Sequence, residues 1–214
     1  MRMVVVAVLV LAVVGLAAAQ CTLKCPDGYS TFTRTPTAAN LKTSVWCVKP
    51  IFSAAPINVT TAQSLCAADS AVITTFENEN ERNQILFALQ QVLTASKQPS
   101  GSIIIDGRRI PECSTADQAI LNAEPCSDNT KAFAVSDKHT DPTFMFQHWA
   151  DTEPSASAFK QDVESCLSLS ISVYPKRNGG INDYLCNYAK APQDENVVEF
   201  WNFGVLCGKL PEFQ

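Results

Sequence analysis

The sequence has few of the residues that enzymes and metalloproteins commonly use for their chemistry. It contains only two histidines, and we find no Gly-x-Ser-x-Gly, no His-Glu-x-x-His and no Cys/His pairing in it. Nucleophilic and zinc-dependent hydrolysis therefore have no recognisable apparatus. His139 and His148 are expected at the surface or at the edge of the core. Glu153 and Glu164 could act as a glycosidase pair, but two carboxylates are common in proteins and we predict that the chain is not an enzyme.

Basic residues are also in short supply. The chain has 16 Lys and Arg residues against 21 Asp and Glu residues, which gives a formal net charge of −5. Binding to nucleic acid or to an anionic lipid surface needs a basic patch, so neither is an expected partner.

Long apolar runs are absent except at the N-terminus. Arg2 precedes an apolar run over residues 4–16, and Ala17-Ala18-Ala19 follows it. This pattern predicts a signal peptide over residues 1–19, because the run is too short to span a bilayer. We therefore expect a secreted, extracellular protein with no membrane insertion. In such a chain the sequon Asn58-Val59-Thr60 predicts N-glycosylation at Asn58, which would make the protein a glycoprotein.

What the chain has in quantity is cysteine. Residues 20–214 show no internal repeat or linker, and we expect a single domain with its core over about residues 25–207. Nine cysteines lie in this region, which in a secreted protein predicts a disulfide framework with one thiol left over. A zinc site at Cys21-x-x-x-Cys25 lacks a histidine or a second cysteine pair at a suitable spacing.

The order of the expected elements favours an α+β fold. Helical periodicity predicts helices over residues 61–68 and 78–93, with cap residues before the first and glutamates in the first turns of the second. Short strands are predicted over residues 29–32, 102–106, 133–135, 166–173 and 199–207. Early helices followed by short strands and long loops are typical of α+β domains.

Several short motifs follow one another in an order that is specific as a set. They are Cys25-Pro26-Asp27-Gly28-Tyr29, Thr61-Ala62-Gln63-Ser64-Leu65-Cys66, Ala71-Val72-Ile73-Thr74-Thr75, Ile104-Ile105-Asp106-Gly107-Arg108, Phe133-Ala134-Val135-Ser136-Asp137 and the segment from His148-Trp149 to Pro154. In this order they resemble the C-type lectin-like domain, in the secreted form common among nematode proteins. The fourth and fifth motifs depart from the family pattern because each lacks its Trp. The resemblance implies two helices packed on a mixed antiparallel sheet, with a long structured loop and disulfide staples.

The resemblance also implies a cysteine pairing. Its core disulfides would be Cys66–Cys207 and Cys166–Cys186, with Cys113–Cys126 and Cys25–Cys47 as local staples and Cys21 as the odd thiol. A Cys21–Cys25 bridge with Cys47 free stays open, because eight cysteines allow 105 pairings.

The same resemblance implies a binding site in the second half of the chain. In lectins of this family, a Glu-Pro-Asn or Gln-Pro-Asp motif, a later Glu and a Trp-Asn-Asp motif surround one Ca²⁺, and the sugar binds that metal through two hydroxyls. The matching positions, for both metal and carbohydrate, are Glu153, Ser155, Glu164, Asn182 and Asp183, with Pro154 as the turn proline that is cis in the family. Carboxylate and amide oxygens suit Ca²⁺, which takes about 6–8 oxygen ligands.

Two positions depart from that motif. Ser155 stands where the family has Asn or Asp, and its shorter side chain would reach less far toward a metal. Ile181 replaces the Trp before Asn182. Glu153 in the first position goes with mannose-type sugars in the family.

The charges at these positions leave two functions open. Three close carboxylates repel one another unless a cation or a proton relieves them. Ca²⁺ would do this, and so would Lys176 and Arg177 from the adjacent loop. The first function is Ca²⁺-dependent binding of a glycan or glycoprotein, which the resemblance places in innate defence. The second is a metal-independent lectin-like scaffold that binds a protein partner.

Overall fold

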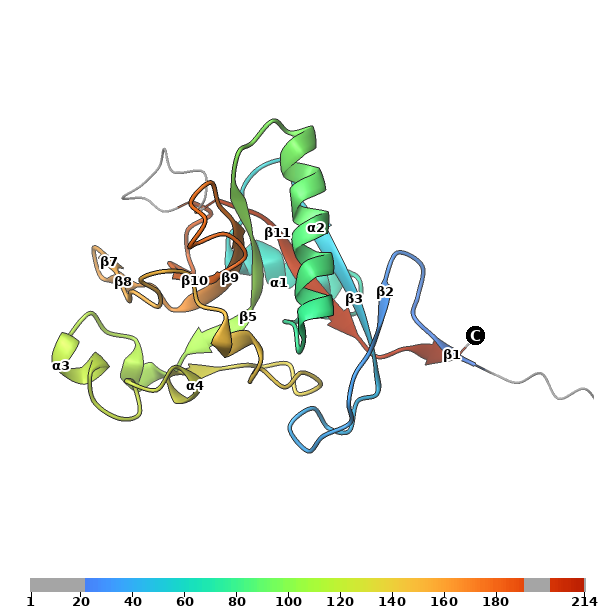
Figure 1. Cartoon of the computed structure of the whole chain (residues 1–214), viewed down its shortest axis with the longest axis horizontal. Coiled ribbons are helices and arrows are strands. Elements are labelled where there is room, and N and C mark those ends of the chain that lie inside the picture. Colours follow the sequence, from blue (N-terminus) through green and yellow to red (C-terminus); the bar gives the residue numbers. More distant parts are fainter. Residues whose placement is uncertain (1–21, 191–200, 214) are drawn as a thin grey trace, which may run out of the picture.

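The computed structural model describes residues 22–190 and 201–213. The predicted signal peptide and Cys21 lie outside the described residues. One mixed sheet runs through the molecule, in the order β10-β9-β5-β11-β3-β2, with β4 paired to β11 and β6 paired to β5 (Figure 1). The β11–β5 pair is parallel, and the other pairs of this sheet are antiparallel.

The strands of the described residues are β1 (Leu23–Lys24), β2 (Ser30–Thr33), β3 (Val45–Phe52), β4 (Val72–Ile73), β5 (Gly101–Arg109), β6 (Phe133–Ala134), β7 (Ala158–Phe159), β8 (Asp162–Val163), β9 (Cys166–Ile171), β10 (Ile181–Tyr184), β11 (Asn202–Lys209) and β12 (Glu212–Phe213). The α-helices are α1 (Val59–Ala68), α2 (Glu79–Ala95), α3 (Gln118–Leu121) and α4 (Asn129–Ala132), and the 3-10 helices are η1 (Pro111–Cys113) and η2 (Met145–Gln147). In this part of the chain no helix has the length and apolarity needed to cross a bilayer.

The two predicted helices are present, and side-chain caps fix where they begin. The Asn58 side chain accepts a hydrogen bond from the Thr61 amide at 3.0 Å, and Asn78 accepts one from the Glu81 amide at 3.0 Å. An asparagine at this position satisfies one of the free amides at a helix start. The apolar face of α2 includes Ile85 and Leu89, both buried in the core.

The sheet separates two apolar cores, because successive side chains of a strand face opposite sides. Ile103 and Ile105 of β5 belong to the larger core with the apolar face of α2. Ile104 belongs to the smaller core with Ala62 and Cys66 of α1. A strand that is apolar on both sides therefore forms the middle layer between the two helices.

The strand predictions were less accurate than the helix predictions. The strand expected to stop at Gly107 continues to Arg109, because a bulge between Ile105 and Arg108 absorbs the glycine. Strand β3 lies where an irregular segment was expected to end at Cys47, and β10 was not assigned as a strand at all. The short helices α3 and α4 were not predicted either.

The structure contains the four disulfides that the resemblance implies: Cys25–Cys47, Cys66–Cys207, Cys113–Cys126 and Cys166–Cys186. The bridge from α1 to β11 joins residues 141 positions apart. Constraining a loop of that length in the unfolded chain is worth up to about 5 kcal/mol in the chain-entropy account.

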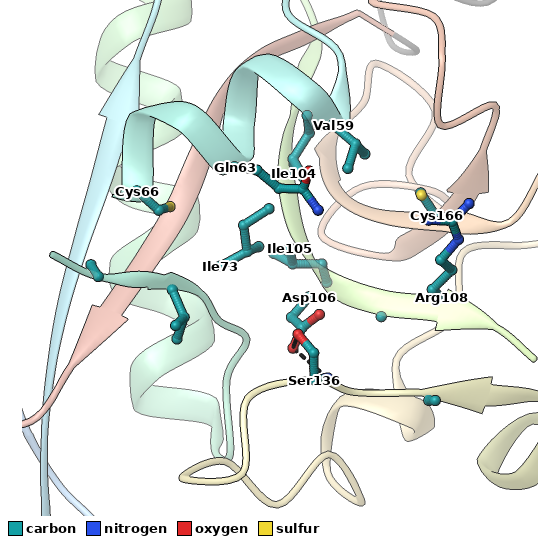
Figure 2. Close-up of a pocket in the computed structure, with 14 residues that line it drawn as sticks. Val59, Gln63, Cys66, Ile73, Ile104, Ile105, Asp106, Arg108, Ser136 and Cys166 are labelled. Atoms are coloured by element: carbon teal, nitrogen blue, oxygen red, sulfur yellow. Dashed lines mark hydrogen bonds between the residues drawn. The ribbon is translucent and has the colours of Figure 1, made fainter. Parts of the chain in front are cut away.

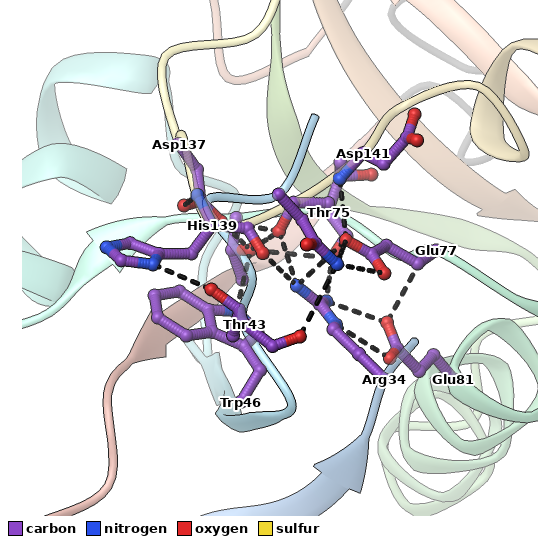
Figure 3. Close-up of polar contacts among 12 residues, drawn as sticks. Arg34, Thr43, Trp46, Thr75, Glu77, Glu81, Asp137, His139 and Asp141 are labelled. Carbon is purple, nitrogen blue, oxygen red and sulfur yellow. Dashed lines mark hydrogen bonds and ion pairs between the residues drawn. The ribbon is translucent and has the colours of Figure 1, made fainter. Parts of the chain in front are cut away.

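A buried arginine ties the start of the chain to the start of α2. Arg34 donates two hydrogen bonds to the Glu81 carboxylate, at 2.9 and 2.8 Å, and the two side chains are 0% and 1% exposed (Figure 3). Its other nitrogen donates to the His139 carbonyl and the Thr140 hydroxyl, both at 2.8 Å. The guanidinium thus joins three segments that are distant in sequence, and its two parallel bonds to one carboxylate are the stronger kind of ion pair.

Candidate functional site

The five predicted site residues come together at the edge of the sheet formed by β9 and β10. Asn182 and Asp183 lie on β10 opposite Ser168 and Leu167 of β9. Glu164 lies two residues before the start of β9, and the loop that contains Glu153 and Ser155 lies against these residues. The Cys166–Cys186 disulfide joins β9 to the residues after β10, so the strands that carry the site are covalently linked.

Ser155 is the centre of this group. Its backbone N–H lies 2.9 Å from both Glu153 Oε2 and Asp183 Oδ1, and its hydroxyl donates to Glu164 Oε2 at 2.6 Å. The Glu153–Pro154 peptide is cis. The short serine side chain, which the sequence marked as a departure from the family motif, here contacts a carboxylate directly. The position has therefore become a hydrogen-bond donor to the acidic residues around it.

Arg109, at the end of β5, is the residue that sequence reasoning missed. Its guanidinium lies 2.7 Å from Asp183 Oδ2, and the two side chains are 2% and 0% exposed. It also donates to the Glu164 carbonyl at 3.0 Å and lies 4.6 Å above the Phe133 ring. The sequence feature that could have indicated it is the pair Arg108-Arg109 after an apolar strand. Adjacent residues of a strand face opposite sides of the sheet, so one of the two arginines must point to a covered side.

A second arginine contacts the outer carboxylate. Arg177 donates to Glu153 Oε1 at 2.9 Å, which is one of the two cations expected from the adjacent loop. Lys176, the other, lies 3.9 Å from Asp151 instead, and both of those side chains are exposed. The acidic group is thus balanced by one buried arginine from β5 and one partly buried arginine from the loop.

Two guanidinium groups face three carboxyl groups. This excess of acidic groups goes with raised pKa values of Glu153 and Glu164. Burial raises the pKa of Glu153 to about 8, assisted by the negative charge of Asp183 and opposed by Arg177. Burial likewise raises the pKa of Glu164 to about 7, although the Ser155 hydroxyl lowers it. Like charges at close range favour proton uptake, so protons supply the positive charge that the two arginines do not.

These raised pKa values predict a loss of stability as the pH rises. Both carboxyls would release their protons near the ordinary value of 4.5 in the unfolded chain, but hold them to about 7 and 8 in the folded protein. Their contribution is fully present below pH 4.5 and disappears as the pH passes through 7–8. We expect the melting temperature to fall by about 15 °C between pH 5 and pH 8.5, measured by circular dichroism.

Glu153→Gln should make this fall smaller, because the amide has no proton to release and only Glu164 of the two still titrates over the interval. Glu212→Gln is the matched control: Glu212 is 56% exposed in its salt bridge to Lys209, and its removal should leave the profile unchanged. A melting temperature that rises over the same interval would contradict the assignment.

As arranged in the structure, the predicted ligand set does not fit Ca²⁺. Both oxygens of Glu153 and both oxygens of Asp183 already accept hydrogen bonds from protein groups. A buried guanidinium contacts Asp183 in the middle of the group. No group of three or more His, Cys, Asp or Glu residues within residues 22–190 and 201–213 has an arrangement that could hold a metal ion. Ca²⁺ takes about 6–8 oxygens, so binding would require these bonds to break.

Asn58, the predicted glycosylation site, is the N-cap of α1. Its oxygen caps the helix at Thr61, and its side-chain nitrogen donates to the Asn187 carbonyl at 3.4 Å in an exposed contact. A glycan on that nitrogen would leave the capping oxygen in place. Glycosylation of Asn58 stays a prediction.

A polar pocket of about 230 Å³ adjoins the site. One wall is the turn after Glu153, with Pro154 and Ser155, and the other is the segment of α3 and α4, with Gln118, Asn122 and Asn129. None of these three amide side chains forms a hydrogen bond to another side chain or backbone group in the described part of the chain. They are therefore available to a polar ligand, since an amide both donates and accepts.

Sequence comparisons with known proteins show the family of this chain. A family model described as "C-type lectin domain-containing protein 141/158" matches residues 31–210. C-type lectin domain-containing protein 158 of Caenorhabditis elegans is 47% identical over 201 residues, which cover 94% of this chain and 95% of that protein. C-type lectin domain-containing protein 141 of the same organism is 42% identical over 206 residues, which cover 87% of this chain and 66% of that protein.

Among solved structures, the carbohydrate-recognition domain of human scavenger receptor C-type lectin matches with a TM-score of 0.44 and 16% identity, over 87% of this chain and 99% of that one. The sequence match to the family model and the two nematode relatives extends over most of the chain. This chain therefore belongs to the family of C-type lectin domain-containing protein 141/158.

Proposed function

We propose that this protein is an extracellular glycan-binding domain that holds the loop containing Glu153 and Ser155 with internal ion pairs and recognises its ligand without Ca²⁺. The observation that supports this most directly is the 2.7 Å contact between Arg109 and buried Asp183, in the middle of the oxygen ligands. The family is non-enzymatic, so binding is the activity to test. Four disulfides are typical of proteins from oxidising compartments, which agrees with secretion.

The ligand surface in this proposal is the polar pocket beside Ser155. Its volume of about 230 Å³ is below the range of about 300–1,000 Å³ that is usual for drug-sized ligands, and suits a small group such as one sugar ring. The amides of Gln118, Asn122 and Asn129 would donate to and accept from sugar hydroxyls. Since no metal would orient Glu153 toward a sugar, the predicted preference for mannose-type sugars loses its basis in this mode of binding.

Ca²⁺-dependent binding of a mannose-type glycan, with a role in innate defence, is the second candidate. The raised pKa values of Glu153 and Glu164 favour it, because a divalent cation would relieve the same charge excess that protons relieve here. Extracellular Ca²⁺ sites of this kind bind with dissociation constants of about 10⁻⁴–10⁻³ M.

Titration calorimetry with Ca²⁺ separates the two candidates. We expect no binding up to several millimolar and the same melting temperature in Ca²⁺ and in chelator. Ser155→Asn restores the family residue, and we expect it to bind no Ca²⁺ either, since Arg109 would still hold Asp183. Saturable binding with the wild-type protein would sink the metal-independent proposal and support the second candidate.

A glycan array in chelator then tests the ligand class. We expect binding that Asn122→Ala weakens at least about tenfold, because a lost hydrogen bond leaves a sugar hydroxyl unpaired. Gln91→Ala, which removes an exposed amide from α2, is the matched control and should bind normally. Retention of a protein partner from solution, with no glycan bound, would instead favour the metal-independent scaffold.

A further inference from the structure

A separate pocket of about 370 Å³ lies beside β5, between α1, β4 and the segment from Ala134 of β6 to Ser136 (Figure 2). None of the five candidate site residues lines it. Its volume falls within the range of about 300–1,000 Å³ that is usual for small-molecule sites. The pocket therefore has room for a ligand of its own, whether or not the polar pocket beside Ser155 binds a glycan.

One side of this pocket is apolar. Val59, Ala71 and Ile73 pack against the smaller core but remain only partly buried, and each of them lines the pocket. Ile104 of β5 lies behind them. The pocket is thus the place where the smaller core is left incompletely covered, and an apolar ligand body would cover it.

A bulge in β5 places an acidic residue at this apolar wall. Ile105 pairs with Leu167 and Arg108 with Cys166, so Asp106 and Gly107 have no counterpart on β9. Gly107 has φ +148°, and a Cβ there would lie 2.3 Å from a Leu167 methyl carbon, so this position needs glycine. Bulges often lie next to functional sites, where they re-aim a side chain.

The Asp106 side chain is largely buried, and only one of its two carboxylate oxygens accepts hydrogen bonds from the described residues. Its Oδ2 accepts three hydrogen bonds, from the Ser136 amide at 2.7 Å, the Ser136 hydroxyl at 2.8 Å and the Asp137 amide at 2.7 Å. Within the described residues no group donates to its Oδ1 and no cation pairs with it, although Asp106 is only 9% exposed. Figure 2 shows this side chain at the pocket, next to Ser136. Oδ1 is not enclosed by protein atoms, so it is open to a ligand in the pocket.

The charge around Asp106 favours a positive partner. Burial raises the pKa of Asp106, the hydrogen bonds from the Asp137 amide and from Ser136 lower it, and the negative charge of Asp137 raises it. Arg108 also lines the pocket, but it is exposed at the rim and forms no ion pair with Asp106. A cation inside the pocket would therefore meet an uncompensated negative charge with apolar groups beside it.

We propose that this pocket binds a small organic cation, with a primary ammonium group at Asp106 Oδ1 and an apolar body against Val59, Ile73 and Ile104. The ammonium group supplies the hydrogen bond that Oδ1 lacks, and charge-assisted hydrogen bonds are stronger than neutral ones. The apolar body gains by removing the exposed parts of Val59 and Ile73 from water, while Ile104 is already buried.

The test compares 2-phenylethylamine with 2-phenylethanol, which has the same carbon skeleton but no charge, by titration calorimetry on the whole protein. We expect saturable binding of the amine with a dissociation constant on the order of 1 mM, and binding of the alcohol at least about tenfold weaker. Asp106→Asn keeps an acceptor for Ser136 but removes the charge. This variant should bind the amine at least about tenfold more weakly. Asp151→Asn removes an exposed acid elsewhere and should leave the affinity unchanged.

A second variant keeps the test valid if Asp106→Asn folds poorly. Ala134 lines the pocket and is exposed, so Ala134→Trp can fill the pocket without entering the core, and should abolish amine binding. Equal affinity for amine and alcohol, unchanged binding by either variant, or no saturation with the wild-type protein would each overturn the proposal.

Discussion

Arg109→Met is expected to lower the free energy of unfolding by about 3–5 kcal/mol, because it leaves the Asp183 carboxylate buried without its cation. Asp183 is fully buried and Arg109 is its only ion-pair partner in the described part of the chain. The substitution also removes the hydrogen bond to the Glu164 carbonyl. For a chain of this length, the melting temperature should fall by about 10 °C in a thermal scan at neutral pH.

Arg108→Met is the matched control, with the same substitution at the next position. Arg108 is exposed and forms no ion pair within the described residues, so its change should stay within about 0.5 kcal/mol. In the double variant Arg109→Met/Asp183→Asn, the buried charge is removed together with its partner, and much of the lost stability should return. If Arg108→Met and Arg109→Met lowered the free energy of unfolding equally, the Arg109–Asp183 ion pair would not be what holds the loop containing Glu153 and Ser155.

Arg34→Met is the second substitution with a large expected effect, again about 3–5 kcal/mol in the free energy of unfolding. It leaves the Glu81 carboxylate at 1% exposure without the two hydrogen bonds that Arg34 donates, and it releases the segment around Thr140. Glu81 lies in the first turn of α2. We expect the midpoint of denaturant unfolding to shift to a lower denaturant concentration, since stability is lost, while the slope of the free energy against denaturant concentration stays unchanged.

Lys24→Met provides the comparison for Arg34→Met, since Lys24 is exposed on β1 and should tolerate the change within about 0.5 kcal/mol. Pairing Arg34→Met with Glu81→Gln removes both charges and should recover part of the loss. No recovery in the double variant would mean that the packing of the arginine stem, and not its charge, carries the effect.

The sequence predicted the fold and the acidic group, but not the arginine that neutralises Asp183. The order of short motifs led to the C-type lectin fold, which the family match confirms. The cap at Asn58 was recognisable because capping depends on neighbouring residues, whereas Asn78 was expected inside the second helix and is its cap. The grouping of Glu153, Glu164 and Asp183 followed from the same resemblance. Arg109 did not, because its partner lies on a strand paired through β9, and nothing in the local sequence shows which carboxylate a strand residue will meet.

Ser155 is a second residue whose role could not be predicted from the local sequence. From the sequence it was a weakened metal ligand, and only the folded chain shows its N–H and hydroxyl directed at three carboxylates. The Asp106 pocket likewise depends on a bulge, and a bulge arises from the register of two strands far apart in sequence.

The sequence by itself determined the family, the two helices and the residue types of the acidic group, because these depend on local periodicity, capping and motif order. The tertiary structure decided which cations neutralise that group and which acid is left without one. That outcome depends on distances of a few ångströms between strands, where a buried charge is stabilised only by the partner that the fold brings into contact.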